Sequence, residues 1–269
     1  MERGISPRGI PHEPIEGRIS YRVWAHPNSR AVFLLVHGLG ANSAWWDSLG
    51  IFFLNNNISS YAIDLRGSNS FKDFEISVQA LTGIIKKENN DKAIFALGES
   101  MGGLIILSAA LKDKTLFDGL VCMSPAFKSK APLKMIDYLK IFFPIFYNPQ
   151  SIYRLPLSAD MCTRDRVALK IIESDYNKDV LSTSKVLFDV FIAQVFMRIS
   201  RMDLGIPTLF LLAGDDKLVD CSVSKKVFNK LKSKDKTIIE YPGMYHSLSI
   251  DLDKEKVFQD ILKWAGGKI

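Results

Sequence analysis

The most constraining feature of this sequence is a Gly-x-Ser-x-Gly segment, residues 98–102 (GESMG), that joins two apolar runs. The run before it (AIFAL) has strand length, and the run after it (LIILSAAL) is typical of a buried helix. Ser100 therefore occupies a sharp strand-to-helix turn, which needs neighbours almost without side chains, here Gly98 and Gly102. The helix N-terminus beneath the hydroxyl favours developing negative charge. The segment predicts a nucleophilic serine.

Apolar runs of strand length alternate with helical patterns along most of the 269 residues. This alternation predicts a single α/β domain, 1–269, with a mostly parallel, doubly wound sheet, and the length suits one such domain. The expected strands are residues 18–24, 31–36, 59–63, 93–97, 120–123, 207–213 and 237–241, and the expected helices are residues 43–54, 77–87, 104–111, 222–231 and one that ends near Trp264.

The middle of the chain departs from this alternation. Residues 126–203 hold no buried strand pattern, but they carry helix-like segments rich in Phe, Leu, Ile and Met, such as 134–147, which Pro144 interrupts. We expect residues 126–203 to form a helical cap, inserted between the two parts of the core, 18–125 and 204–269. Ligands of open α/β sheets bind at the carboxyl edge of the strands, so the cap should cover that edge.

Composition excludes several classes of protein. With 47% hydrophobic and 24% charged residues the chain is typical of a soluble globular protein, and no run reaches the roughly 18 to 20 apolar residues of a membrane span. The N-terminal residues 1–7 lack a signal-peptide core. Three cysteines without metal-type spacing indicate free thiols in a reducing cytoplasm. The net charge of +6 comes without a nucleic-acid-binding motif, so we expect no nucleic-acid partner.

A serine nucleophile needs a base, and the chain has four histidines. His12 lies in a Pro-rich leader, His26 precedes a turn, and His37 belongs to an HGLG loop. His246 lies in the loop that follows the last expected strand, at the same sheet edge as Ser100. His246 is therefore the predicted base, and His37 is expected to support its loop by hydrogen bonding.

The remaining members of the site follow two other strands. Asp216 in the segment AGDDKLVD is the expected acid that orients the imidazole, with Asp215 and Asp220 as alternatives. The order Ser, Asp, His along the chain is that of the α/β-hydrolases. The backbone N–H groups of Leu39 and Met101 are the expected donors to an oxyanion, and Gly38 supports the Leu39 loop.

The segments HGLG, DLRGSNS, GESMGG, AGDDKLVD and YPGMYH follow one another as in the α/β-hydrolase superfamily, over residues 32–265. GESMGG, AGDDKLVD and the cap segment 175–181 most resemble the branch of monoacylglycerol lipases and lysophospholipases. The resemblance implies an α/β-hydrolase fold and a serine esterase without cofactor or metal, with Ser100 as nucleophile, Asp216 as acid and His246 as base. The sequence departs from that branch at residues 40–46 (GANSAWW) and 68–69, where the branch commonly has Gly-Glu-His and His-Gly.

These features predict a carboxylic ester hydrolase with an acyl-serine intermediate, acting on monoacylglycerols, lysophospholipids or related medium- to long-chain esters. An apolar cap could also contact a lipid interface transiently. Three alternatives stay open: a carboxylesterase for small or aromatic esters, an acyltransferase that uses the same intermediate, and a ligand-binding sensor on a hydrolase fold.

Overall fold

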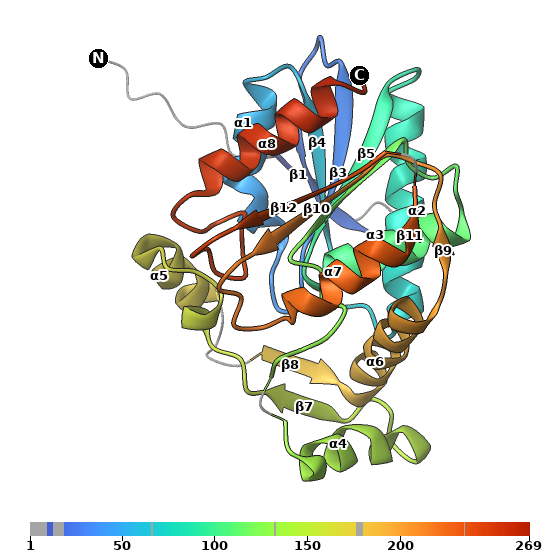
Figure 1. Cartoon of the computed structure of the whole chain (residues 1–269), viewed down its shortest axis with the longest axis vertical. Helices are drawn as coiled ribbons and strands as arrows, with labels where there is room; N and C mark the ends of the chain where they lie inside the picture. Colours follow the sequence, from blue (N-terminus) through green and yellow to red (C-terminus); the bar gives the residue numbers. More distant parts are fainter. Residues whose placement is uncertain (1–9, 13–18, 66, 132, 176–179, 234) are drawn as a thin grey trace.

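The structure is a computed structural model that describes residues 10–12, 19–65, 67–131, 133–175, 180–233 and 235–269 (Figure 1). The main sheet has eight strands in the order β1-β2-β4-β3-β5-β6-β10-β12. β1 and β2, and β2 and β4, pair antiparallel, and the other neighbours pair parallel. The strands are β1 (Ile10–His12), β2 (Ser20–Trp24), β3 (Ala31–Val36), β4 (Ser59–Asp64), β5 (Ala93–Glu99), β6 (Gly119–Met123), β10 (Thr208–Ala213) and β12 (Lys236–Tyr241).

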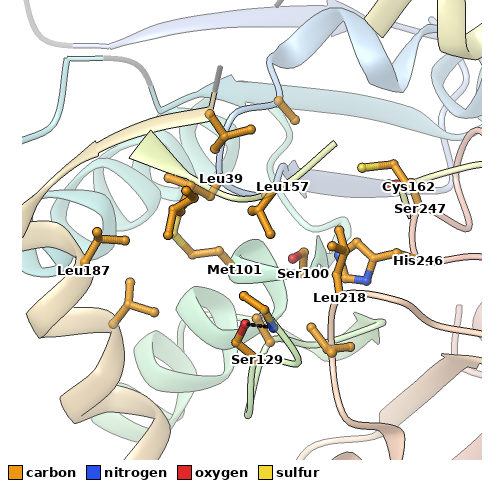
Figure 2. A pocket seen from close by; sticks show the side chains of 18 of the residues that line it. Leu39, Ser100, Met101, Ser129, Leu157, Cys162, Leu187, Leu218, His246 and Ser247 are labelled. Atoms are coloured by element: carbon orange, nitrogen blue, oxygen red, sulfur yellow. Dashed lines mark hydrogen bonds between the residues drawn. The ribbon is translucent and has the colours of Figure 1, made fainter. Parts of the chain in front are cut away.

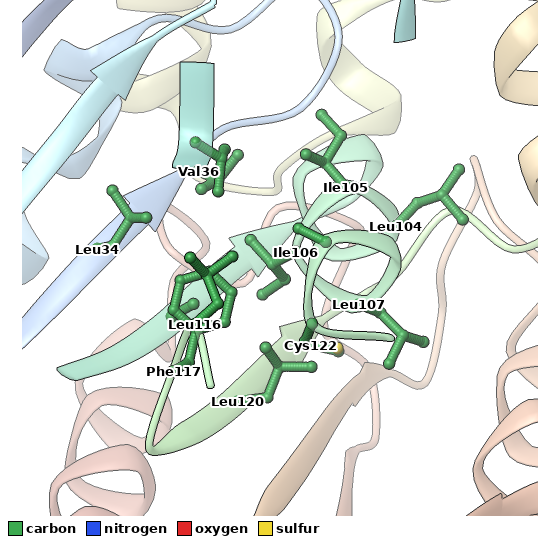
Figure 3. Close-up of a cluster of buried hydrophobic side chains, with 14 of the residues drawn as sticks. Leu34, Val36, Leu104, Ile105, Ile106, Leu107, Leu116, Phe117, Leu120 and Cys122 are labelled. Atoms are coloured by element: carbon green, nitrogen blue, oxygen red, sulfur yellow. The ribbon is translucent and has the colours of Figure 1, made fainter. Parts of the chain in front are cut away.

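Helices cover both faces of this sheet, which confirms the predicted doubly wound α/β architecture. Side chains alternate along β3, so Val32, Leu34 and Val36 point into one buried cluster and Ala31, Phe33 and Leu35 into the other. The first cluster packs against α2 (Phe71–Glu88), α3 (Met101–Lys112) and α7 (Cys221–Lys230), and the second against α1 (Asp47–Leu54) and α8 (Lys254–Gly266). Figure 3 shows the α3 side of the first cluster, between β3 and β6.

The largest differences between the predicted and the observed helices concern two of them. α2 begins at Phe71 rather than at residue 77, because the Ser70 hydroxyl accepts a hydrogen bond from the Asp73 N–H at 3.2 Å and caps the helix there. The predicted helix 43–54 is a short 3-10 helix (η2, Ser43–Trp46) followed by α1. The structure also adds β1, an edge strand that contains His12.

The described residues of 126–203, the predicted cap, lie mostly on one side of the sheet, toward the bottom of Figure 1. They contain α4 (Met135–Phe142), η3 (Phe143–Phe146), η4 (Ala159–Met161), α5 (Arg166–Asp175) and α6 (Ser184–Ile199). The prediction of an all-helical segment is incomplete, because β7 (Ile152–Leu155) and β8 (Val180–Thr183) pair antiparallel within it. Most of their side chains are at least partly exposed, so they lack the apolar run that marks a buried strand. Residues 176–179 of the segment 175–181 lie outside the described residues.

Two short strands form a small sheet beside α7: β9 (Met202–Asp203) and β11 (Leu231–Lys232) pair in parallel. Across the described part of the chain, no helix has both the length and the apolar character needed to cross a bilayer.

Candidate active site

Ser100 lies between the end of β5 and the first residue of α3, in a backbone conformation that few non-glycine residues adopt, with φ 57° and ψ −119°. The turn is held from two sides. The Ser100 N–H donates to the Met123 carbonyl at 2.9 Å, and the Ser100 carbonyl accepts from the Ala126 N–H at 3.0 Å. The ends of β5 and β6 therefore keep the hydroxyl of Ser100 at the carboxyl edge of the sheet.

The glycines around this turn are required by close contacts. A Cβ on Gly102 would lie 2.0 Å from the Val36 carbonyl oxygen, and one on Gly98 would lie 2.4 Å from the backbone of Gly102. A Cβ on Gly38 would lie 2.9 Å from the Cβ of Ser100. The loop after β3 therefore packs directly against the nucleophile turn, because none of these residues has a side chain.

His246 and Asp216 form a buried pair. The imidazole Nδ1 lies 2.8 Å from Asp216 Oδ2, and the two residues are 4% and 3% exposed. Asp216 Oδ1 accepts backbone hydrogen bonds from Leu218 and Val219 at 2.8 and 2.9 Å, so the loop after β10 fixes the carboxylate. Burial alone would lower the pKa of His246, but the charge and hydrogen bond of Asp216 outweigh burial and raise it above its usual range.

The two alternative acids have other surroundings. Asp215 is exposed. Asp220 caps α7 by accepting from Ser222, and its carboxylate pairs with Lys128 at 3.2 Å. Of the three carboxylates that the sequence left open, Asp216 is the one in contact with His246.

His37 holds the loop after β3 through both nitrogens of its ring. Nε2 accepts from the Leu65 N–H at 3.0 Å, which makes Nδ1 the protonated nitrogen and the donor to the Gly38 carbonyl at 2.8 Å. Because the C=O and N–H of a trans peptide point in opposite directions, this bond turns the Leu39 N–H away from the His37 ring. His26 lies elsewhere, in an exposed turn where it accepts from the Asn28 N–H.

A pocket of about 700 Å³ opens at this site (Figure 2). Ser100, Met101, Leu39 and His246 line it, and in Figure 2 the side chains of Ser100 and His246 point into the same part of it. Most of the remaining lining comes from 126–203 and is apolar: Leu133, Tyr138, Ile141, Phe142, Leu155, Leu157, Leu187, Val190 and Phe191. The predicted site residues are therefore brought together beneath the predicted cap. Within the described residues, no three His, Cys, Asp or Glu side chains are grouped so that they could hold a metal ion.

Sequence reasoning missed several residues of this pocket. Cys162 and Ser247 lie beside His246 (Figure 2), and the Ser247 N–H donates to the Cys162 carbonyl at 2.8 Å. Trp45 lines the pocket from η2. Cys162 and Trp45 belong to segments without a motif, and their positions depend on how residues 126–203 and the loop after β3 fold over the sheet.

Comparison with known proteins gives the family. Residues 27–253 match the family described as "Serine aminopeptidase, S33". The chain belongs to this family. Curated relatives of this S33 chain include a monoglyceride lipase of Mus musculus, 25% identical over 98% of this chain and 94% of the relative. A phospholipase of Bacillus subtilis, YtpA, is 26% identical over 88% of this chain and 95% of the relative.

Solved structures agree on the fold. A monoacylglycerol lipase of Paleococcus ferrophilus superposes on this S33 chain with a TM-score of 0.82, at 23% identity, over 93% of this chain and 99% of its own. The fold is that of the α/β-hydrolases, as the sequence motifs predicted.

Proposed function

We propose that this chain is a serine hydrolase of carboxylic esters that acts through an acyl-enzyme. The observation that carries the proposal is the convergence of Ser100, on its strained turn, with the buried His246–Asp216 pair in one pocket. The S33 family match and the lipase and phospholipase names of the relatives support it.

We infer a role for each group from its position in the pocket. Ser100 attacks the ester carbonyl while His246 takes its proton, and Asp216 stabilises the imidazolium. The N–H of Met101, in the first turn of α3, has no acceptor within the helix. Together with the Leu39 N–H it receives the oxyanion. His246 then protonates the leaving alcohol. Water attacks the acyl-enzyme with His246 as base, which releases the acid and restores Ser100.

The substrate that this pocket fits best has an acyl chain of medium or long length. Each buried methylene contributes about 0.8 kcal/mol. Most residues that line the pocket of about 700 Å³ are apolar, and leucine, isoleucine, valine and aromatic side chains are prominent among them. We propose monoacylglycerols or lysophospholipids as the substrate class, in keeping with the relatives that are named monoglyceride lipase and phospholipase.

The family description names an aminopeptidase, and the pocket gives a reason to favour esters. A peptide substrate with a free ammonium group would need a carboxylate partner when buried. Glu99, a buried carboxylate of the pocket lining, already accepts two hydrogen bonds from Ser249. The other two carboxylates of the lining, Asp160 and Glu173, are exposed, and most of the remaining lining is apolar and suits a hydrocarbon chain.

Hydrolysis of a p-nitrophenyl ester series from short to long chains tests the proposal, with Ser100→Ala beside the unaltered chain. Serine-dependent rates that rise with chain length support it, and monoacylglycerols and lysophospholipids then follow as substrates. Activity limited to short chains would indicate a small-ester carboxylesterase. Acyl transfer to added glycerol at the expense of hydrolysis would indicate an acyltransferase. Ligand-induced thermal stabilisation without product would indicate a sensor.

We also propose that residues 126–203 act as a cap that contacts lipid interfaces. Large apolar side chains are exposed along α4 and η3, with Met135 at 77%, Phe143 at 64% and Phe146 at 85%. Clustered exposure of this kind is typical of an interaction surface. In a flotation assay with phosphatidylcholine–phosphatidylglycerol vesicles, the double variant Phe143→Ser/Phe146→Ser should bind less. Ile76→Ser, which removes an apolar side chain that is 50% exposed on α2, should bind as the unaltered chain does.

A reducing cytoplasm is the compartment we propose for the protein. Cys122, Cys162 and Cys221 are all unpaired in the described part of the chain, as they would be where disulfides are kept reduced. Fractionation of the cells that make the protein, with separate membrane and soluble fractions, tests both this proposal and the interface contact.

A further inference from the structure

Glu99 is a buried carboxylate next to Ser100 that the proposed reaction does not use. It is the last residue of β5 and is 5% exposed. Its Oε2 accepts from the Ser249 hydroxyl at 2.7 Å, and its Oε1 accepts from the Ser249 N–H at 3.1 Å. Ser249 is 1% exposed and follows His246 by three positions. The contact therefore joins the residue before the nucleophile to the loop that carries the base.

A neutral side chain could make this contact without the cost of burying a charge, which is several kcal/mol for an ion without a partner. Glu75 is also deeply buried and also accepts from a serine hydroxyl, that of Ser108 at 2.7 Å, but Lys112 supplies its counter-charge. Among the described residues, Glu99 has no Lys or Arg ion partner. The cation within its electrostatic reach is the imidazolium of His246.

Two carboxylates act on the imidazole from different parts of the fold, and a third contact holds the residue that follows it. Asp216 does so from the loop after β10 and Glu99 from β5, and both raise the pKa of His246 by their charge. From the cap, the Cys162 carbonyl accepts from Ser247, the neighbour of His246. Burial raises the pKa of the Cys162 thiol to about 12, so this thiol contributes no charge at neutral pH.

We propose that Glu99 is a positioning residue for His246, which holds the histidine loop through Ser249 and serves as a second counter-charge to the imidazolium that forms when Ser100 loses its proton. This inference rests on the proposed hydrolase mechanism. In that mechanism Asp216 orients the ring by direct contact, whereas Glu99 acts through the loop and through space. Burial raises the pKa of Glu99 above its usual range, and the Ser249 hydrogen bonds and the positive charge of His246 offset part of that rise. Both carboxyl oxygens of Glu99 accept hydrogen bonds from Ser249, as the oxygens of an ionised carboxylate do.

Glu99→Gln tests the role of the charge, because glutamine keeps the size of the side chain and can still bond to both groups of Ser249. Glu75→Gln is the matched control, a buried glutamate with a serine partner outside the pocket. The imidazole signals are followed by NMR against pH, and His246→Asn identifies the signal of His246 among the four histidines. The His246 midpoint should move to lower pH in Glu99→Gln and stay in place in Glu75→Gln. Equal midpoints in Glu99→Gln and the unaltered chain would overturn the proposal.

Kinetics give a second result from the same variants. The acidic limb of kcat/KM should move to lower pH in Glu99→Gln, and the plateau kcat should fall severalfold with little change in KM. A purely structural role would lower activity without moving the limb. If the unaltered chain had no hydrolase activity, that result would count against the proposed function. The titration of the imidazole needs no substrate, so it would still test the role of Glu99.

If Glu99→Gln does not fold, the interaction between Glu99 and His246 can be measured on Glu99 instead, in a variant of His246. In protein labelled with ¹³C at the glutamate carboxyl carbons, the Glu99 midpoint should move to higher pH in His246→Asn, because a favourable interaction between two sites is reciprocal. An unchanged Glu99 midpoint would overturn the proposal.

Discussion

Arg164, in the proposed cap, donates from Nε to Oδ2 of Asp251 at 2.9 Å, and the Asp251 side chain is completely buried. The same carboxylate accepts from the Arg164 N–H at 2.8 Å, from the Thr163 hydroxyl at 3.1 Å and from the Tyr245 N–H at 2.9 Å. Tyr245 precedes His246. One carboxylate therefore connects the cap to the loop that holds the proposed base.

Replacement of Asp251 should be strongly destabilising. Asp251→Ala leaves Arg164 and two backbone N–H groups without their acceptor, and breaking such a buried pair costs about 3–5 kcal/mol in the free energy of unfolding. Asp253→Ala is the control. Asp253 also pairs with Arg164, but its side chain is 63% exposed, so its loss should lower the free energy of unfolding by less than about 1 kcal/mol. Urea unfolding followed by circular dichroism measures both, and similar losses in the two variants would contradict the expected difference.

The contribution of Asp251 should depend on pH in a defined direction. Burial would raise the pKa of its carboxyl, but the backbone N–H bonds from Arg164 and Tyr245 outweigh burial and lower it below the usual 3.8. A group with a depressed pKa in the folded state stabilises the protein above its unfolded pKa, and this contribution is lost as the pH falls through the folded pKa. The stability difference between the unaltered chain and Asp251→Asn should thus be constant near neutral pH and shrink below about pH 4. The midpoints of urea unfolding between pH 3 and 7 measure this stability difference. A difference that widens as the pH falls would contradict the prediction.

We expect the raised pKa of His246 to set the acidic limb of the proposed activity. The neutral imidazole is the base, so kcat/KM should fall as the pH drops through a midpoint above the 6.5 of a free imidazole. Asp216→Asn should move that midpoint to lower pH and reduce kcat by about 10⁴-fold. Asp215→Asn, at the exposed neighbouring position, should change neither. If Asp215→Asn lost activity while Asp216→Asn kept it, Asp215 rather than Asp216 would be the acid that orients the imidazole.

The same pKa has an opposite consequence for stability. Because the folded pKa of His246 lies above its unfolded value, the His246–Asp216 interaction stabilises the fold fully below the unfolded pKa. This stabilisation is lost as the pH rises through the folded pKa. Activity and this part of the stability are therefore expected to change in opposite directions across the same pH range.

The core and the catalytic edge could be predicted because their signals are local. A buried parallel strand such as β3 is a continuous apolar run, and the turn at Ser100 needs glycines at fixed offsets, so both are visible in a few residues. The segment AGDDKLVD and the family resemblance favoured Asp216 but left Asp215 and Asp220 as alternatives. The structure supplies the contact with His246, which the spacing could not show.

The contacts that join the cap and the loops could not be predicted from one sequence. Glu99 and Ser249 are 150 positions apart, and Arg164 and Asp251 are 87 apart, so nothing in either local sequence indicates its partner. β7 and β8 were missed for another reason. Their side chains are mostly exposed or half-buried, and a short strand of this kind has no period that separates it from a loop.

His37 is expected to support the oxyanion donor rather than to transfer protons. His37→Ala removes the acceptor of the Leu65 N–H and the donor to the Gly38 carbonyl, so the Leu39 N–H loses its orientation. The plateau kcat should fall by about ten- to a hundredfold, with the midpoint of the acidic limb unchanged. His26→Ala, in an exposed turn, serves as the control and should behave as the unaltered chain. A shifted limb in His37→Ala would instead indicate that this ring takes part in proton transfer.

The nucleophile turn should tolerate no side chain at Gly102, whereas a glycine of α2 should accept one. Gly102→Ala places a methyl group 2.0 Å from the Val36 carbonyl oxygen, so β3 and α3 must separate. The free energy of unfolding of Gly102→Ala should be lower than that of the unaltered chain by about 1–3 kcal/mol or more. Gly83 lies inside α2, where an added methyl group would have nothing within 4 Å, and Gly83→Ala should stabilise the chain by up to about 1 kcal/mol. Thermal and urea unfolding of the two variants should therefore move in opposite directions, and a neutral Gly102→Ala would mean that the contact between β3 and α3 relaxes freely.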